Sequence, residues 1–526
     1  MILPLALLAS GFALWRIGRR LQFFLHIHQL EGYKRSGFLR WVGARPFDAW
    51  LRLSHLLGAV LLAVHWLGGL PVWALLLLWA ACFASSRRYR RDRPKKPLAM
   101  TPRMTREAVT AGLLALLLPA VTLSLLQTGF WSAWLTGLLA ADLLAPGLVL
   151  GGATLMAPVE AYIREGFKRQ ARRKLASRPD LRIVAITGSY GKTSVKFAVA
   201  EVLAQRYQVL ATPGSFNTPM GICKVINNDL KPHHQVLVLE MGIRHPGDIA
   251  ELCAIARPHV AVITGIGIAH LETMGSQDAI AREKGSLLDF LLPGGSAVLN
   301  ADDPYYEAFA SKTRHLAVST GGTSADLVAS EVDYGAEGTR FTVRADDEVV
   351  PVTMRLLGRH NVGNALLALA VGRQMGIRLR AGARALSRQD PVPHRLALRE
   401  EGGLLVLDDA FNSNPVGARN AVEVLGAFAP RTRFVITPGM VELGDREYEE
   451  NRAFGAAMHG HVDHAILVGP ARTVAISEGL RDAGMPAERI HVVGTLFEAR
   501  ELLASLASSG DVVLYENDLP DQYTEA

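Results

Sequence analysis

Residues Ile186 to Ser194 have the types and spacing that bind a nucleotide phosphate. They read Ile-Thr-Gly-Ser-Tyr-Gly-Lys-Thr-Ser and lie between a predicted strand at 182–187 and a helical stretch. Glycines let backbone N–H groups wrap a phosphate at a helix N-terminus, where negative charge is favoured. Lys192 would neutralise the β- and γ-phosphates, and the Thr193 hydroxyl would bind Mg²⁺. The usual pattern has a further glycine where this chain has Ile186, so an ordinary glycine turn is the alternative; the strand–turn–helix context favours nucleotide binding.

Two more side chains, Glu240 and His270, are of types that can bind a metal ion, and Lys284 follows them in the chain. Glu240 follows a continuous apolar strand at 236–239, and a carboxylate at the carboxyl end of a buried strand points into the ligand crevice of an α/β sheet. Its alternative is a surface glutamate. His270 follows the next predicted strand, although a lone histidine is more often structural. Lys284 stands beside Arg282 and Glu283, so its alternative is a solvated helix lysine.

The scaffold for these residues is predicted from Leu181 onward. Short β-branched runs alternate with helical stretches, which is the pattern of βαβ architecture. Residues 326–357 have the pattern of short strands joined by turns, and a helix is expected at 361–375. The predicted strands are 182–187, 236–241, 259–264, 296–300, 404–408, 433–437, 464–468, 489–493 and 511–515.

Two prolines in Gln389-Asp390-Pro391-Val392-Pro393 interrupt the helical pattern and mark a boundary between two α/β units. The fold class is therefore α/β, with a P-loop central domain and a C-terminal Rossmann-like domain, preceded by an all-α transmembrane domain. We place the three domains at 1–175, 176–390 and 391–526.

The charge of the chain is divided unevenly. Residues 1–174 carry 23 Lys and Arg against 7 Asp and Glu, whereas the remaining residues carry 33 against 42. The pI of about 9.3 thus belongs to the first third, where the long apolar runs also lie. This argues against a nucleic-acid binder. Three scattered cysteines indicate a reduced, cytosolic catalytic part.

The first third is expected to lie in the cell (inner) membrane. Apolar stretches run over 2–15, 53–84 and 108–156, and turns split the last two. If the basic residues lie on the cytoplasmic side, the N-terminus lies outside the cell. The chain then crosses the membrane five times and the catalytic domains lie in the cytoplasm. The basic run at 87–106 could bind nucleic acid or phospholipid, but a topology determinant on anionic lipid is favoured. Asp142 lies inside the last span, either in a cavity or at the headgroup edge.

Taken together, the motifs resemble those of the Mur ligase family, and within it the MurF branch that adds D-alanyl-D-alanine to the peptidoglycan precursor. The resemblance covers about residues 181–510. It is carried by 186–194, Gly214 to Pro219, Leu239 to Gly242, Ala269 to Glu272, Lys284-Gly285, Asn300 to Asp303, Gly358 to Asn364, Asp408 to Pro415 and Gly439 to Gly444.

The resemblance implies an ATP-dependent amide ligase in which ATP activates a carboxylate as an acyl phosphate that an amine attacks. ATP and Mg²⁺ would be its cofactors. Gly188, Ser189, Gly191, Lys192, Thr193 and Ser194 would hold the phosphates. Thr193, Glu240, His270 and Lys284, the last as a carbamate, would hold metal. Asn361 and Asn364 would bind adenine, with helix capping as their alternative. Arg395 would reach the phosphates, and Asp409 would lie near the ribose. Lys192, Lys284, His270 and Arg395 are the expected catalytic residues.

Three departures limit what the resemblance implies. Membrane spans stand where the family has a domain that grips the UDP end of the substrate. Gly265 replaces a common asparagine. An acidic ending, Tyr515 to Tyr523, replaces a Lys-Gly-Ser type of ending. That ending could select a cationic amine, although a solvated tail is slightly favoured. Asn412 and Asn414 would face substrate or hold their loop.

The leading hypothesis is therefore a membrane-anchored ligase of MurF type in peptidoglycan-precursor synthesis. Its partners would be a small-molecule or lipid-linked carboxylate, an amine (an amino acid or a dipeptide) and membrane lipid, with no nucleic acid. A second hypothesis keeps the chemistry but changes the substrate to a lipid-linked precursor, or to a poly-amino-acid as in poly-γ-glutamate and cyanophycin synthetases. A third is a non-catalytic nucleotide-binding membrane protein, which predicts a degraded metal site. The sequence alone leaves the two substrates and the oligomeric state open.

Overall fold

The computed structural model describes residues 2–45, 50–84, 97–126, 129–322, 324–335, 337–346, 348–410, 413–441 and 443–519, without the side chain of residue 272. The basic run predicted to set the topology lies largely outside these ranges, at 87–96, as does the end of the chain from 520. The chain forms two compact units, Met1–Glu165 and Gly166–Leu519. Each is described separately.

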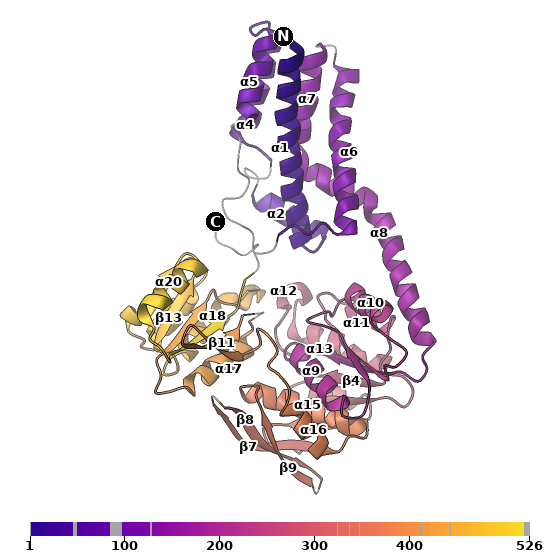
Figure 1. Cartoon of the computed structure of the whole chain (residues 1–526), viewed down its shortest axis with the longest axis vertical. Helices are drawn as coiled ribbons and strands as arrows, with labels where there is room; N and C mark the ends of the chain where they lie inside the picture. The colour runs from indigo at the N-terminus through magenta and orange to yellow at the C-terminus, as the bar shows by residue number, and fades with distance from the viewer. Residues whose placement is uncertain are drawn as a thin grey trace. The chain divides into compact units, whose positions relative to one another are not determined.

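The first unit is a bundle of helices. Its members are α1 (Ile2–Leu30), α2 (Arg35–Ala44), α4 (Leu53–Trp66), α5 (Val72–Ala84), α6 (Pro102–Leu125), α7 (Phe130–Leu143) and the first part of α8 (Ala145–Ala176). Helix α1 packs against α5, α6 and α7, as Figure 1 shows. Many large apolar side chains of the bundle are exposed, whereas several charged side chains are buried inside it.

Three helices, α1, α6 and α8, are long and apolar enough to cross a membrane. Helices α4 and α5 are apolar but have only 14 and 13 residues, less than the ~20 that a spanning helix needs. The fifth predicted span is divided at Leu144, between α7 and α8, beside Asp142 and Pro146. The five-span topology therefore stays a prediction.

The second unit begins with a nine-stranded sheet in the order β2-β3-β1-β4-β5-β6-β7-β8-β9. Its first seven strands pair in parallel, and β7, β8 and β9 are antiparallel. The strands are β1 (Arg182–Thr187), β2 (Val209–Ala211), β3 (Val236–Glu240), β4 (Val260–Ile263), β5 (Ser296–Asn300), β6 (His315–Ser319), β7 (Leu327–Gly335), β8 (Gly338–Ala345) and β9 (Glu348–Met354). Separate apolar cores, one containing α9 (Lys192–Leu203) and α15 (Arg359–Gln374), cover the two faces of the parallel part.

A six-stranded sheet follows, in the order β10-β11-β15-β12-β13-β14. Every pair is parallel except β10 with β11. Its strands are β10 (Ala397–Glu401), β11 (Leu404–Asp409), β12 (Arg433–Thr437), β13 (His464–Val468), β14 (Ile490–Val493) and β15 (Val512–Glu516). The last strand in sequence, β15, thus lies between β11 and β12 in the middle of the sheet.

The predicted strands all form, with ends that agree within a residue. Three strands without a strong sequence signal were missed. Strand β2 has only three residues, β6 begins with a histidine, and β10 ends in Arg-Glu-Glu and lies at the edge of its sheet. Such short or edge strands gain their structure from pairing with a neighbour, which local sequence does not encode.

Candidate active site

The predicted phosphate loop connects β1 to α9 and needs glycine at two positions. Gly191 has φ 74° and stands directly before α9, and a Cβ at Gly188 would collide with the Thr264 hydroxyl. The loop is fastened to the segment after β4, because Ser189 N donates to Gly265 O over 2.7 Å and Gly267 N donates to Ser189 Oγ over 2.9 Å. These bonds hold the loop in a fixed shape directly before the N-terminus of α9, where negative charge is favoured.

Lys192 lies inside this loop. Its Nζ donates to the carbonyl oxygens of Gly188 at 2.7 Å and Ser189 at 3.2 Å. Burial lowers the pKa of Lys192 to about 8; Glu240 acts in the opposite sense, and Arg395 lowers the pKa further. Ser194, also predicted to bind phosphate, lies half-buried in the first turn of α9.

Glu240 and Thr193 converge at the carboxyl end of the first sheet. Glu240 ends β3 opposite Ile186 of β1, and it is buried. The Thr193 hydroxyl donates to Glu240 Oε2 over 2.9 Å, and Asn217 Nδ2 donates to Oε1 over 3.0 Å. The surface-glutamate alternative is therefore wrong.

Lys196 is a site residue that the sequence analysis missed. It is fully buried, its Nζ lies 3.2 Å from Glu240 Oε2, and it also donates to the carbonyl of Gly214. A signal was present, because Lys196 stands four residues after Lys192 and so lies on the same helix face. Asn217 belongs to the motif at 214–219. Its hydrogen bond to Glu240 depends on how that loop folds back onto the sheet.

His270 and Lys284 lie near Lys192. His270 has a left-handed backbone (φ 68°) and immediately precedes α12 (Leu271–Met274). Burial, with Lys192, Lys284 and Arg244 nearby, lowers its pKa to about 3. Lys284, on α13 (Gln277–Gly285), is fully buried, and its Nζ has no hydrogen-bond partner among the described residues. Burial lowers the pKa of Lys284 well below its ordinary value, and the positive charge of Lys192 lowers it further. The negative charge of Glu283 acts in the opposite direction. The solvated-lysine alternative is therefore wrong.

These residues fit the ions that the sequence predicts. The Thr193 hydroxyl and the Glu240 carboxylate are adjacent oxygen ligands, and Mg²⁺ commonly takes one or two protein oxygens and completes its shell with phosphate and water. In the part of the chain that the structure describes, no three His, Cys, Asp or Glu side chains form a metal cage. The lone buried amine of Lys284 could enter a metal shell only as an anion, which a carbamate would be.

Asn361 and Asn364 lie on α15, which begins at Arg359, two residues before the predicted start. Gly358 is the N-cap, so the capping interpretation of Asn361 is wrong. Asn361 Nδ2 donates to Leu357 O and Asn364 Nδ2 donates to Asn361 Oδ1, each over 2.9 Å. The Asn364 amide lies against Gly191 of the phosphate loop. Their role in adenine binding stays a prediction.

The C-terminal domain contributes Arg395 to the same site. Burial lowers the pKa of Arg395, whereas Asp409 and Glu240 favour its charge. Asp409, at the end of β11, accepts from Leu396 N over 3.0 Å, and burial raises its pKa to about 6 although Arg395 opposes this. Arg395 also lowers the pKa of Lys192 and Lys196, so it lies close enough to repel both lysines. A polyanion is the ligand that such a site favours.

The part of the acidic ending that the structure describes, Tyr515 to Leu519, does not form the predicted solvated tail, and the rest of the ending lies outside the described residues. Tyr515 and Glu516 belong to β15, and Glu516 and Asn517 are buried. Glu516 stands directly opposite Asp409 in the sheet and accepts from Ser413 Oγ over 2.5 Å. Burial, then the charge of Asp409, raises the pKa of Glu516 well above its ordinary value.

Of the two asparagines predicted to face substrate or hold a loop, Asn412 lies outside the described residues. Asn414 is the N-cap of α17 (Pro415–Gly426), where its Oδ1 accepts from Gly417 N over 2.8 Å. It therefore has a structural role in starting this helix.

Comparison with known families agrees with this geometry. Residues 186–372 match the Mur ligase middle domain, and residues 394–515 match the Mur ligase, glutamate ligase domain. A relative named UDP-N-acetylmuramoyl-tripeptide–D-alanyl-D-alanine ligase, from Mycobacterium tuberculosis, is 36% identical over 357 residues, which are 64% of this chain and 70% of the relative. The Escherichia coli protein of that name is 33% identical over 293 residues, 55% of this chain and 64% of the relative.

Solved structures give the same assignment. MurF from Thermotoga maritima, in complex with ADP, superposes with a TM-score of 0.61 and 28% identity over 68% of this chain and 80% of that chain. MurF from Acinetobacter baumannii superposes with a TM-score of 0.61 and 26% identity over 68% and 77%. The chain belongs to the Mur ligase family of ATP-dependent ligases. Within that family it is MurF-like, acts in peptidoglycan-precursor synthesis, and uses ATP and Mg²⁺.

Proposed function

We propose that this chain joins the free carboxylate of a UDP-linked muramoyl tripeptide to the amine of D-alanyl-D-alanine. The likeness to relatives that carry this activity in their names supports the choice of substrates. The observation that carries the proposal is the convergence of Lys192, Thr193, Glu240 and Arg395, which come from two domains, around one phosphate loop.

The phosphate loop and its cations would align the γ-phosphate of ATP with the attacking carboxylate. Lys192 and Arg395 would offset the charge that accumulates when the phosphoryl group moves to the carboxylate. Thr193 and Glu240 would hold Mg²⁺, which supplies charge neutralisation and orients the phosphates when bound. Because Arg395 belongs to a different domain from Lys192, domain closure would assemble the site and exclude water from the acyl phosphate.

Lys284 and His270 would bind a second metal ion, in addition to the Mg²⁺ held by Thr193 and Glu240. A neutral amine adds CO₂ and releases a proton to give a carbamate anion, and the lowered pKa of Lys284 favours the neutral amine that this addition needs. The lowered pKa of His270 leaves a ring nitrogen lone pair available at neutral pH. Asn361 and Asn364 would contact adenine, and Asp409 would lie near the ribose.

The helical unit would anchor the enzyme in the cell membrane, with the ligase domains in the cytoplasm. Three apolar helices long enough to span and a large exposed apolar surface support this proposal. The two family domains leave the first 185 residues unmatched. A lipid-linked carboxylate substrate is therefore the second candidate, because it would place the reacting group at the membrane surface.

The test is phosphate release from ATP by the detergent-purified full chain. The carboxylate donors are the UDP-linked muramoyl tripeptide and its lipid-linked counterpart, each with and without D-alanyl-D-alanine. Release that needs both the UDP-linked tripeptide and the dipeptide supports the proposal, and release only with the lipid-linked donor supports the second candidate. Tight ATP binding without amine-dependent release from any pair would contradict ligase activity.

A further inference from the structure

The helical unit contains a buried charged cluster that the ligase reaction does not use. Arg16 and Arg20 lie one turn apart on α1, and both are almost fully buried. Buried Asp142, near the end of α7, and His55, in the first turn of α4, face them. The ring of Phe83, at the end of α5, lies 4.7 Å from Arg16 Cζ. Four helices therefore meet at this cluster.

Asp142 is shared by three partners. Arg16 Nε lies 2.8 Å from Asp142 Oδ2, and Arg20 Nε lies 3.5 Å from Oδ1. His55 Nδ1 accepts from the backbone N–H of Arg52, so the ring carries its proton on Nε2 and donates it to Asp142 Oδ2 over 2.8 Å. The two guanidiniums, the carboxylate and the neutral ring together carry one net positive charge, and protonation of His55 would only add to it.

The outer edge of the Arg16 guanidinium, formed by Nη1 and Nη2, lacks a hydrogen-bond acceptor among the described residues. Its Nη1 is buried and has no hydrogen-bond partner among the residues that the structure describes. Nη2 lies 3.2 Å from His55 Nε2, which bears the ring proton and so cannot accept. A buried, unsatisfied guanidinium N–H is costly, and the ring face of Phe83 compensates only partly. Within the described ranges, therefore, no anionic oxygen accepts from Nη1 of Arg16.

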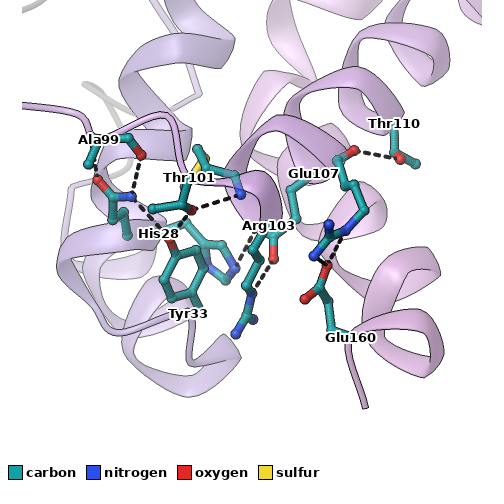
Figure 2. Close-up of polar contacts among 11 residues, drawn as sticks. His28, Tyr33, Ala99, Thr101, Arg103, Glu107, Thr110 and Glu160 are labelled. Carbon is teal, nitrogen blue, oxygen red and sulfur yellow. Dashed lines mark hydrogen bonds and ion pairs between the residues drawn. The ribbon is translucent and has the colours of Figure 1, made fainter. Parts of the chain in front are cut away.

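A second cluster in the same unit shows how such charges are balanced elsewhere. Arg103 Nε donates to buried Glu107 over 2.8 Å, as Figure 2 shows. Arg106 Nε donates to Glu160 over 2.6 Å. Each of these carboxylates has its own guanidinium. At Asp142 a single carboxylate serves both Arg16 and Arg20.

The cluster also lies at one edge of the apolar part of the bundle. Arg16 directly follows the apolar run 2–15 of α1, whereas His55 begins α4, Phe83 ends α5 and Asp142 ends α7. If these helices enter a membrane, the edge of their apolar part lies at the level of the lipid phosphates. The arginine fork matches phosphate geometry.

We propose that Arg16 and Arg20 form a binding site for the phosphate group of an anionic lipid headgroup. The phosphate oxygens would accept from the outer edge of Arg16 and offset the excess positive charge. The site goes beyond the ligase activity, and its test is a binding measurement that does not depend on ligation.

The experiment measures the thermal midpoint and the bound lipid, by native mass spectrometry, of the full chain in detergent. The probes are phosphatidic acid, diacylglycerol of the same acyl chains, and inorganic phosphate. We expect phosphatidic acid to bind and raise the midpoint, whereas diacylglycerol does neither. Inorganic phosphate acting as strongly as phosphatidic acid, with the same dependence on Arg16, would contradict a lipid source.

Three variants separate a ligand site from a structural ion pair. Arg16→Gln should weaken phosphatidic acid binding at least tenfold, whereas Arg19→Gln, an exposed arginine on the same helix, should leave it unchanged. Without lipid, Arg16→Gln should not lower the midpoint, because Arg20 and Asp142 remain as a balanced pair. Asp142→Asn, which removes the competing carboxylate, should bind phosphatidic acid at least as tightly as the unmodified chain. Equal binding by the Arg16→Gln and Arg19→Gln chains, or no response of the unmodified chain to phosphatidic acid, would overturn the proposal.

Discussion

At the scale of single residues, the active site depends on lysines that are buried for different reasons. Lys192 donates to backbone carbonyls, Lys196 pairs with Glu240, and the Lys284 amine has no hydrogen-bond partner in the part of the chain that the structure describes. Burying an amine without a partner costs stability, so its persistence in a core indicates chemistry. Because their surroundings differ, we expect substitutions of these lysines to affect ligation and stability differently.

Lys284→Ala should lower ATP-dependent ligation by about 10²-fold or more. The site would lose the proposed carbamate of Lys284, an anionic group that offsets the positive charge of the metal ion. Small carboxylic acids should restore part of the rate by entering the space left by the side chain. The measurement is amine-dependent phosphate release. Arg282→Ala, an exposed position on the same helix, serves as the control. Full activity of Lys284→Ala would show that no carbamate is needed.

Lys196→Met should destabilise the nucleotide-free protein by about 3 kcal/mol, because it leaves Glu240 as a buried, uncompensated charge. Mg²⁺ with nucleotide should restore more stability to this variant than to the unmodified chain, since the ion supplies the missing positive charge. Urea unfolding with and without the ligands measures both effects. Lys312→Met, which breaks the exposed pair with Asp289, should cost less than about 1 kcal/mol. A similar loss in both variants would contradict the role of Lys196.

At the scale of elements, the carboxyl ends of parallel strands collect the functional groups. Strands β1 and β3 bring Thr193 and Glu240 together, and β11 and β15 place Asp409 directly opposite Glu516. Two like charges at directly opposite positions of neighbouring strands are unfavourable unless a proton or a cation lies between them.

This carboxyl pair predicts a pH dependence of stability. The pKa of Asp409 is raised to about 6, from an ordinary value of 3.8, so the native state holds a proton that the unfolded chain has released. The free energy of unfolding contributed by the pair therefore falls as pH rises from about 4 to about 6. Glu516→Gln should flatten this slope and stabilise the protein at pH 7.5 by about 2 kcal/mol. Urea unfolding across this pH range measures it, and an unchanged slope would show that no proton is shared.

At the scale of the whole molecule, the chain consists of an apolar helical unit and an α/β ligase unit whose compact cores are separate. The division falls between residues 165 and 166, inside α8. Because the family domains lie entirely in the second unit, catalysis and membrane attachment should be separable.

A fragment of residues 166–526 should be found in the soluble fraction after cell lysis, whereas the full chain should require detergent for extraction. The physical reason is that the fragment lacks the helices whose large exposed leucines and tryptophans favour a lipid environment. Fluorescent nucleotide binding by the fragment provides the folding control. A soluble full chain would contradict membrane anchoring.

The sequence by itself determined the local features of this protein. The strand–turn–helix around Lys192, the buried strand before Glu240 and the β-branched runs of both sheets depend on neighbouring residues, and the structure contains them at the predicted positions. Only the tertiary structure decided which distant groups meet. It placed Lys196 on Glu240, set Glu516 opposite Asp409 in a central strand, and gathered Arg16, His55 and Asp142 from three helices. These contacts arise from helix packing and strand order, which bring together residues far apart in the chain and leave no local spacing from which they could be predicted.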